Sequence, residues 1–292
     1  MSNTILRNEN VSVTLKSLGG ELTSIKDASG TEYLWQGNPD FWSGQAPVLF
    51  PIVGCLRNGT ATIGNSKTCS FGRHGLARKL EFTLVSSSET SAVYSLKADD
   101  STKEQYPYDF ELQMIYELTD HGVKVSHKVI NHGDIVMPYC IGGHPAFNCP
   151  LKAEEKQSDY QLSFDTDKTL VCSILGETGL LTARKKEFEL TNHKMRIVED
   201  LFDEDALIIE GNQAKRVGLV NPQGETYLEV EFDAPLFGIW SPAKKSAPFV
   251  CIEPWYGRSD KEDFSKKLEE REWGNELKAG EIFEKSYQIR VK

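Results

Sequence analysis

Apolar and polar residues alternate along much of this chain. The alternation is clear over residues 10–18 (NVSVTLKSL) and returns in the tail, 285–292 (KSYQIRVK). Between them, alternating runs flank turn residues within 81–98, 110–133 and 217–232. A period of two is typical of half-buried strands, and turn signals about every 8–12 residues are typical of a β-sandwich or barrel. The pattern therefore predicts antiparallel hairpins at all three places.

Two further stretches predict strand pairs, and one predicts a helix. Residues 24–35 (SIKDASGTEYLW) indicate two strands around an Asp-Ala-Ser-Gly turn, and residues 61–71 (ATIGNSKTCSF) indicate a hairpin with Gly-Asn at its tip. Helix signals are few. In SDKEDFSKKLEE (259–270), Ser259 and Glu262 have the spacing of a capping box, so we expect a helix that begins there.

The arrangement of these elements predicts one domain. No Pro/Ser-rich linker and no fixed-period repeat divides residues 1–292. Two charge-rich stretches, 152–159 and 183–189, are expected to be solvated loop or edge segments. We therefore expect a single, mostly antiparallel all-β domain large enough for two packed sheets.

Composition narrows the range of partners. The chain has a formal net charge of −10, which disfavours non-specific binding to nucleic acid or to an anionic membrane, because phosphate contacts need clustered Lys and Arg. The first residues lack the pattern of a signal peptide, and the longest uncharged apolar stretch, 45–56, is too short to span a bilayer. The six cysteines form no CxxC pair, so we expect reduced thiols, no zinc cluster and a cytoplasmic location.

Four short stretches each place a titratable side chain at a strand end or a turn. They are FPIVGCLRNG (50–59, with Arg57), FGRHGLAR (71–78, with His74), GGHPAF (142–147, with His144) and FVCIEPWYG (249–257, with Glu253). In GGHPAF the proline disfavours the helical conformation of the histidine before it, and the glycines let another group approach the backbone closely. The glutamate follows an apolar run, which indicates a partly buried carboxylate that needs partners.

The sequence lacks the motifs of several common kinds of active site. No HExxH-type spacing joins the histidines and the glutamate, so a metal site is disfavoured. The chain has no GxSxG nucleophile elbow, so a Ser-His-Asp arrangement is disfavoured. It has no GxGxxG or P-loop sequence, so a nucleotide cofactor is unsupported. Trp240, Trp255 and Tyr256 are either core aromatics or flat faces for a sugar. Acid–base chemistry on a neutral polar ligand therefore remains as the expected function of these residues.

The motifs together also resemble a known family. APVLFPIVGCLRNG, RHGLAR, GGHPAFN and CIEPWYG, in this order, are similar to the aldose 1-epimerase (galactose mutarotase) family, in its LacX-like, mutarotase-related branch. The likeness extends from about Trp35 to Gly257. It implies a large twisted antiparallel β-sandwich, the galactose mutarotase-like supersandwich, with few short helices.

The resemblance also implies roles for individual residues, without any metal or organic cofactor. Glu253 matches the catalytic base and His144 the catalytic acid. The implied substrate-binding residues are His74, on the ring-oxygen side, Arg57, Trp255 and the candidate sugar-binding acid Asp205.

The expected activity is that of an aldose 1-epimerase, an isomerase that interconverts the α and β anomers of an aldohexose by acid–base ring opening. We expect a monomer or homodimer. One alternative is a non-catalytic carbohydrate-binding or sensing module on the same fold. A second is a hexose-6-phosphate mutarotase, because Arg73, Arg78 and Lys79 surround His74 in the sequence. A third, a glycoside hydrolase, needs a second acid within about 10 Å of Glu253.

Overall fold

The structure, a computed structural model, describes residues 3–64, 67–265 and 267–292. These residues form 24 strands, one short α-helix and four 3-10 turns. All the named strands within the described part pair in antiparallel fashion. The predicted all-β, antiparallel architecture is therefore confirmed.

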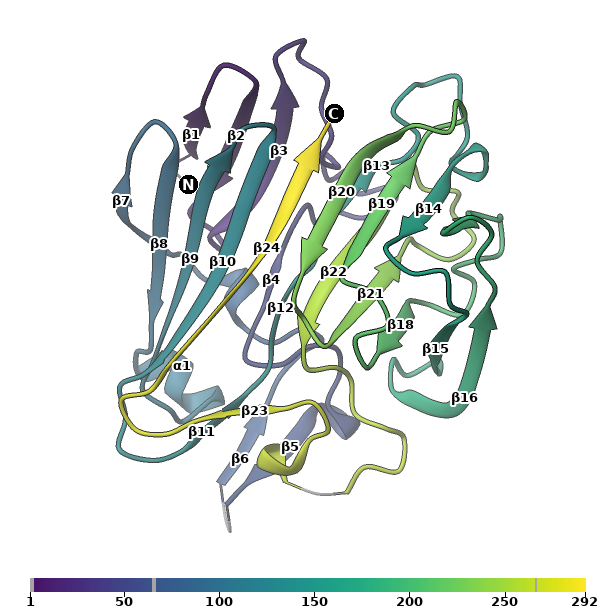
Figure 1. The fold of residues 1–292 in the computed structure, drawn as a ribbon. Helices are drawn as coiled ribbons and strands as arrows, with labels where there is room; N and C mark the ends of the chain where they lie inside the picture. Colours follow the sequence, from purple (N-terminus) through teal and green to yellow (C-terminus); the bar gives the residue numbers. More distant parts are fainter. Residues whose placement is uncertain (1–2, 65–66, 266) are drawn as a thin grey trace.

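A nine-stranded sheet crosses the molecule from β7, at the left of Figure 1, to β14, at the right. In sheet order its strands are β17 (Lys194–Arg196), β14 (Gln161–Phe164), β19 (Arg216–Val220), β20 (Thr226–Phe232), β24 (Ile282–Val291), β10 (Gly122–Asn131), β9 (Phe110–Thr119), β8 (Ser91–Lys97) and β7 (Thr83–Ser87). The C-terminal strand β24 is hydrogen-bonded to β10 on one side and to β20 on the other. The last residues of the chain therefore join the two halves of this sheet.

An eight-stranded sheet carries the residues of greatest functional interest. Its order is β16 (Leu181–Phe188), β15 (Leu170–Leu175), β18 (Leu207–Glu210), β21 (Leu236–Trp240), β22 (Phe249–Tyr256), β12 (Ile141–Gly143) and β4 (Val48–Leu49), with β13 (Ala146–Asn148) also on β22. All eight residues of β22 are buried, which explains its nearly continuous apolar sequence. The two large sheets pack against each other, since Gly143 of β12 lies against the ring of Tyr287 in β24.

Smaller sheets and short helical turns complete the fold. One small sheet holds β1 (Asn3–Arg7), β2 (Val11–Lys16) and β3 (Glu21–Asp27), and two-stranded pairs join β5 (Thr60–Ile63) to β6 (Lys67–Ser70) and β11 (Met137–Tyr139) to β23 (Asn275–Leu277). The helical elements are α1 (Asp100–Gln105) and the 3-10 turns η1 (Arg57–Gly59), η2 (Ala77–Lys79), η3 (Gln157–Asp159) and η4 (Leu268–Glu270).

The hairpins predicted from the alternation are confirmed within 81–98, 110–133 and 217–232. The strand pair predicted for 24–35 is only half right. Its first half is β3, but its second half forms single bridges, Lys26 with Glu32 and Leu34 with Phe147. The hairpin at 61–71 forms as β5 and β6, while Asn65 of its predicted tip lies outside the described residues.

The helix predicted to begin at Ser259 does not form there, and within the described part of 259–270 the helical residues are the 3-10 turn η4 (Leu268–Glu270). The Ser259 hydroxyl does not cap a helix but accepts a hydrogen bond from the backbone N–H of Cys55 (2.9 Å). Asp260 accepts a hydrogen bond from the Arg271 guanidinium (2.6 Å), and its backbone pairs with Leu181. These long-range partners compete with the local pattern and hold the segment in an irregular conformation.

The α-helix that the described residues contain is α1, which the alternation did not predict. Asp99 caps it, since its side chain accepts a hydrogen bond from the backbone N–H of Thr102 while the Thr102 hydroxyl accepts one from Asp99. The three-residue spacing of this reciprocal cap is the sequence signal for it.

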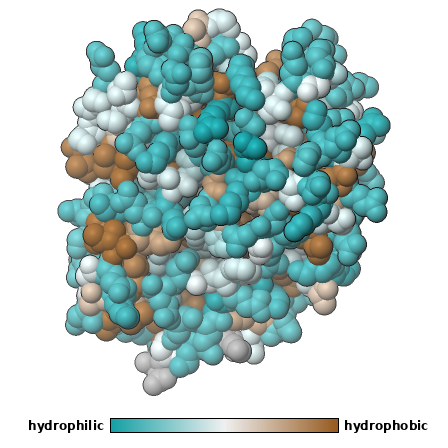
Figure 2. All heavy atoms as spheres, viewed as in Figure 1, coloured by the Kyte–Doolittle hydropathy of each residue, from teal (hydrophilic) through white to brown (hydrophobic). Residues whose placement is uncertain are grey.

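The face of the molecule drawn in Figure 2 is largely hydrophilic. On this face, apolar side chains form small, separate groups.

Three further expectations concern an edge strand, the cysteines and membrane spans. The predicted solvated stretch 183–189 is largely the exposed edge strand β16, and the six cysteines are free of disulfide bonds. Within the described ranges, no helix is long and apolar enough to cross a membrane.

Candidate active site

Strand register brings His144 and Glu253 together. Gly142 pairs with Trp255, and Ala146 pairs with Cys251, so His144 lies across from Glu253 between two paired segments of the sheet. Side chains at directly opposite positions of antiparallel strands project from the same face. His144 Nε2 lies 3.3 Å from Glu253 Oε2, although 109 residues separate them in the sequence.

Burial dominates the electrostatics of this pair. The exposed fraction is 7% for His144 and 1% for Glu253. Burial lowers the pKa of the His144 imidazole to about 3 and, with the charge of Asp205, raises the pKa of the Glu253 carboxyl well above its ordinary value. His144 Nδ1 and Glu253 Oε2 have no hydrogen-bond partner among the described residues. Burial therefore disfavours the charged form of both groups.

Aromatic rings surround the His144 imidazole. Trp42 stacks on it with ring centroids 4.9 Å apart, and Trp240, at the end of β21, contacts it edge-on at 5.6 Å. Lys245, in the loop after β21, donates hydrogen bonds from its ammonium group to the carbonyl groups of residues 40–41, close in sequence to Trp42. The imidazole therefore contacts one indole face-on and the other edge-on.

The two glycines before His144 make room for aromatic rings. A Cβ at Gly142 would lie 2.7 Å from the Trp255 ring, and a Cβ at Gly143 would lie 2.7 Å from the Tyr287 hydroxyl. On the other side of β22, a Cβ at Gly238 would come within 2.6 Å of the Trp255 ring. The Trp255 indole thus lies between two glycine positions, close to Glu253 on its own strand.

His74 approaches the same site from a different loop. Its backbone has a positive φ of 68°, and its N–H donates to the Gly54 carbonyl (2.8 Å). The Gly54 N–H donates in turn to His74 Nδ1 (3.1 Å). Burial, with the charges of neighbouring groups, lowers the pKa of His74 well below its usual value, so the imidazole is neutral and carries its proton on Nε2. Its ring lies edge-on to His144, at 5.4 Å.

Two arginines and an aspartate lie in the same site as His144, His74 and Glu253. Arg73 forms an ion pair with Asp205 at 3.3 Å and donates to Cys55 Sγ. Arg78 donates to the Arg73 carbonyl, while its buried Nε has no partner among the described residues. Burial lowers the pKa of Arg78, but the guanidinium remains charged at neutral pH. Arg73 is therefore paired with a carboxylate, whereas Arg78 still has an N–H group that can donate a hydrogen bond to a ligand.

These groups line one cavity of about 260 Å³. Its lining residues are Trp42, Gly54, Arg73, His74, Arg78, His144, Leu175, Asp205, Ala206, Ile208, Trp240, Glu253, Trp255 and Ser259. This volume is below the roughly 300–1,000 Å³ typical of sites for drug-sized ligands. The cavity therefore suits a single small molecule.

Five of the six residues predicted for the site meet in this cavity: His74, His144, Asp205, Glu253 and Trp255. The structure places the sixth, Arg57, apart from them: its side chain donates to the Phe264 carbonyl (2.9 Å) and is not among the residues that line the cavity.

Trp42 was missed as a site residue. The only signal for it was an aromatic pair within a loop otherwise rich in Gly, Asn and Ser. Arg73 and Arg78 were considered only as phosphate ligands, yet the structure places both at the wall of the cavity.

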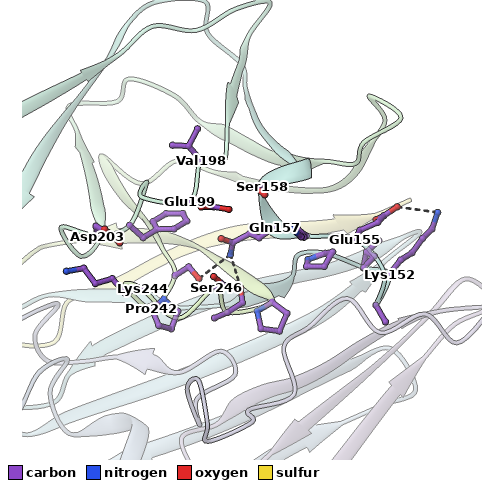
Figure 3. Close-up of a pocket in the computed structure, with 18 residues that line it drawn as sticks. Lys152, Glu155, Gln157, Ser158, Val198, Glu199, Asp203, Pro242, Lys244 and Ser246 are labelled. Carbon is purple, nitrogen blue, oxygen red and sulfur yellow. Dashed lines mark hydrogen bonds and ion pairs between the residues drawn. The ribbon is translucent and has the colours of Figure 1, made fainter.

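A larger cavity, of about 550 Å³, lies between residues 150–158, 198–203 and 241–248 (Figure 3). Gln157 crosses its floor and donates to the Ser241 hydroxyl and to two carbonyl groups. Its described lining contains no histidine and none of the six predicted site residues. Size alone therefore does not locate the chemistry, since the titratable groups are gathered in the smaller cavity.

The two-sheet fold and the acid–base cavity define an all-β protein built around a buried imidazole–carboxyl pair. The chain matches the family model described as aldose 1-epimerase over residues 2–290. Protein LacX of Lactococcus lactis subsp. lactis, in its plasmid form, is 39% identical over 296 residues, which cover 98% of both chains. The chain therefore belongs to the aldose 1-epimerase family.

Solved structures agree with this assignment. A galactose mutarotase related enzyme from Lactobacillus acidophilus is 33% identical, with a TM-score of 0.94 over 100% of this chain and 97% of that one. A galactose mutarotase-like protein from Lactobacillus casei ATCC 334 is 26% identical, with a TM-score of 0.93 over 100% of both chains. The fold is therefore galactose mutarotase-like, and the family supports a general epimerase or mutarotase role.

Proposed function

We propose that the cavity interconverts the α and β anomers of an aldohexose by opening and closing the sugar ring. One observation carries the proposal: paired strands deliver an imidazole and a carboxyl group, 3.3 Å apart, to the same small cavity. Mutarotation needs a base at the C1 hydroxyl and an acid at the ring oxygen. Glu253 is the proposed base and His144 the proposed acid.

A pair that shares one proton suits this reaction. During ring opening, the Glu253 carboxylate takes the proton of the C1 hydroxyl while the His144 imidazolium protonates the ring oxygen. Ring closure reverses both transfers after rotation about C1–C2, so neither group is consumed. Burial disfavours the charged form of the pair, and sugar hydroxyls that bond the unpartnered atoms of the pair stabilise that charged form.

The remaining residues bind and orient the sugar in this proposal. His74 presents Nε2–H as a neutral donor, and Arg78 offers its unpartnered Nε–H to a sugar oxygen. Asp205, held by Arg73, accepts from a sugar hydroxyl. The tryptophan faces provide apolar surface for the C–H side of the ring.

A free sugar is favoured over a sugar 6-phosphate. Arg73 is already paired with Asp205, and Lys79 is exposed on η2 and is not among the residues that line the cavity. Arg78 alone remains for a phosphate dianion, which usually binds several charged or backbone donors. The test compares mutarotation rates of glucose and galactose with those of their 6-phosphates, and we expect higher kcat/KM for the free sugars.

Two other functions predict different results. A non-catalytic sugar-binding module would bind the sugar without accelerating the change in optical rotation of a freshly dissolved anomer. A glycoside hydrolase has some support, because Asp205 is a second acid in the cavity with Glu253. It would release reducing sugar from simple glycosides, whose C1 oxygen carries no proton for Glu253 to remove. We expect rapid mutarotation by polarimetry and no hydrolysis.

A further inference from the structure

Cys251 lies next to the acid–base pair. It precedes Glu253 by two residues on β22, so both side chains project from the same face of the strand. Its strand partner is Ala146, two residues beyond His144. One imidazole nitrogen, the Cys251 sulfur and one Glu253 carboxyl oxygen all lie within 4.8 Å of one another.

This donor set matches the preferences of Zn²⁺, which binds His nitrogen, Cys sulfur and carboxylate oxygen in tetrahedral sites. Bond lengths of roughly 2.0–2.3 Å place two ligand atoms on one such ion roughly 3.3–3.8 Å apart. The contact between His144 and Glu253, 3.3 Å, is already within this range. The Cys251 sulfur lies within 4.8 Å of both atoms, so the distances at this third ligand must shorten to about 3.8 Å or less when the ion binds.

A second observation also points to a ligand. Glu253 Oε2, the atom that lies 3.3 Å from His144 Nε2, is buried without a hydrogen-bond partner among the described residues. Buried polar groups are normally paired, because leaving one unsatisfied costs free energy. The cavity that both residues line gives an ion a route from solvent and leaves its fourth coordination position open.

We propose that His144, Cys251 and Glu253 form an inhibitory Zn²⁺ site at the floor of the cavity. The ion bonds to the imidazole nitrogen, the thiolate and the carboxylate, while the protons of the thiol and the carboxyl group pass to solvent. The dipositive ion and its two anionic ligands have no net charge together, which suits a buried position. Inhibition by the ion depends on the proposed function, because the metal occupies the two groups assigned to move protons. Binding of the ion does not depend on the proposed function.

Direct binding tests the site without reference to activity. The metal-free full-length chain is titrated with ZnCl₂ by calorimetry in buffers of different ionisation enthalpy, and with Co²⁺ by absorption spectroscopy. We expect one high-affinity ion per chain, release of protons on binding, and a thiolate-to-Co²⁺ charge-transfer band. Cys251→Ala should weaken Zn²⁺ binding at least tenfold and abolish the band. Cys172→Ala, at a buried free thiol on β15, is the matched control and should retain both.

Inhibition is measured by polarimetry, each variant being compared with its own metal-free rate. Zn²⁺ should inhibit the wild type and Cys172→Ala, EDTA should restore the rate, and rising sugar concentration should raise the apparent inhibition constant. Cys251→Ala should need at least tenfold more Zn²⁺. Equal Zn²⁺ affinity in the wild type and Cys251→Ala, or inhibition that sugar does not relieve, would overturn the proposal. If no variant has mutarotase activity, the proposed function fails, and the calorimetric and Co²⁺ titrations still decide the metal site.

Discussion

Replacing Glu253 by glutamine is the sharpest test of the proposed acid–base pair. The substitution keeps the size and shape of the side chain but removes the group that accepts the proton of the C1 hydroxyl. A positioned acid or base contributes typically ~10²–10⁴-fold to the rate. At about 1.4 kcal/mol per tenfold change, the barrier should rise by about 3–5 kcal/mol.

The contact between the two groups predicts a further result. His144→Asn should lower kcat/KM by a similar factor of ~10²–10⁴. Because His144 Nε2 and Glu253 Oε2 lie 3.3 Å apart and act on the same substrate carbon, their contributions are not independent. The double variant should therefore lose at most about tenfold more than the worse single variant. The assay is polarimetry on freshly dissolved α-glucose and α-galactose.

Stability separates a catalytic role from a structural one. Burial raises the pKa of Glu253, so ionisation of this group opposes folding as pH rises above its ordinary pKa, and the glutamine variant should be at least as stable at pH 7. Glu111 is the matched control. Burial opposes its ionisation, but hydrogen bonds from Gln113, His132 and Ser95 outweigh burial and lower its pKa to about 2. Glu111→Gln should unfold at lower denaturant concentration yet keep full turnover.

Glu253→Gln should therefore lose activity and keep its stability, whereas Glu111→Gln should lose stability and keep its activity. Full mutarotase activity in Glu253→Gln, with the fold intact by circular dichroism, would refute the assignment of the base. Activity lost only in proportion to the fraction of unfolded protein would refute it as well. An additive loss in the double variant would show that the two groups do not act on one proton-transfer event.

Three other predictions concern charge, packing and binding. His127 is buried without a hydrogen-bond partner in the described structure, and burial lowers its pKa to about 4; stability should fall as pH drops below about 6.5, and His127→Leu should remove about 2 kcal/mol of the loss between pH 6.5 and 5 in urea titrations. Gly142→Ala forces a Cβ against the Trp255 ring and should lower the free energy of unfolding by about 1–3 kcal/mol, whereas Gly72→Ala, with nothing near its Cβ, should change it by less than about 0.5 kcal/mol. Arg73→Ala should raise KM for the sugar at least tenfold, and an equal effect of Arg57→Ala would contradict the placement of Arg57 outside the cavity.

The local pattern was sufficient for the hairpins within 81–98, 110–133 and 217–232, because side-chain alternation and turn chemistry act over a few residues. It failed where a distant partner outweighed a local preference. Ser259 has the spacing of a helix cap, but its hydroxyl accepts a hydrogen bond from Cys55, 204 residues away. Asp260 is likewise held by Arg271. A short stretch of sequence contains only one of the two hydrogen-bond partners, so its pattern cannot predict that the distant interaction forms instead of the helix cap.

The sequence by itself determined the fold class and the chemical types of the site residues: histidines beside glycine or proline, and a glutamate after a buried strand. Only the tertiary structure decided which of them meet. The register of β22 against β12 and β13 sets Glu253 across from His144 and brings Cys251 beside both. The same register and packing exclude water, which is why the pair favours its neutral forms. Residues so far apart in the chain gain a common environment only when the sheet has formed, because register and burial are properties of the whole sheet.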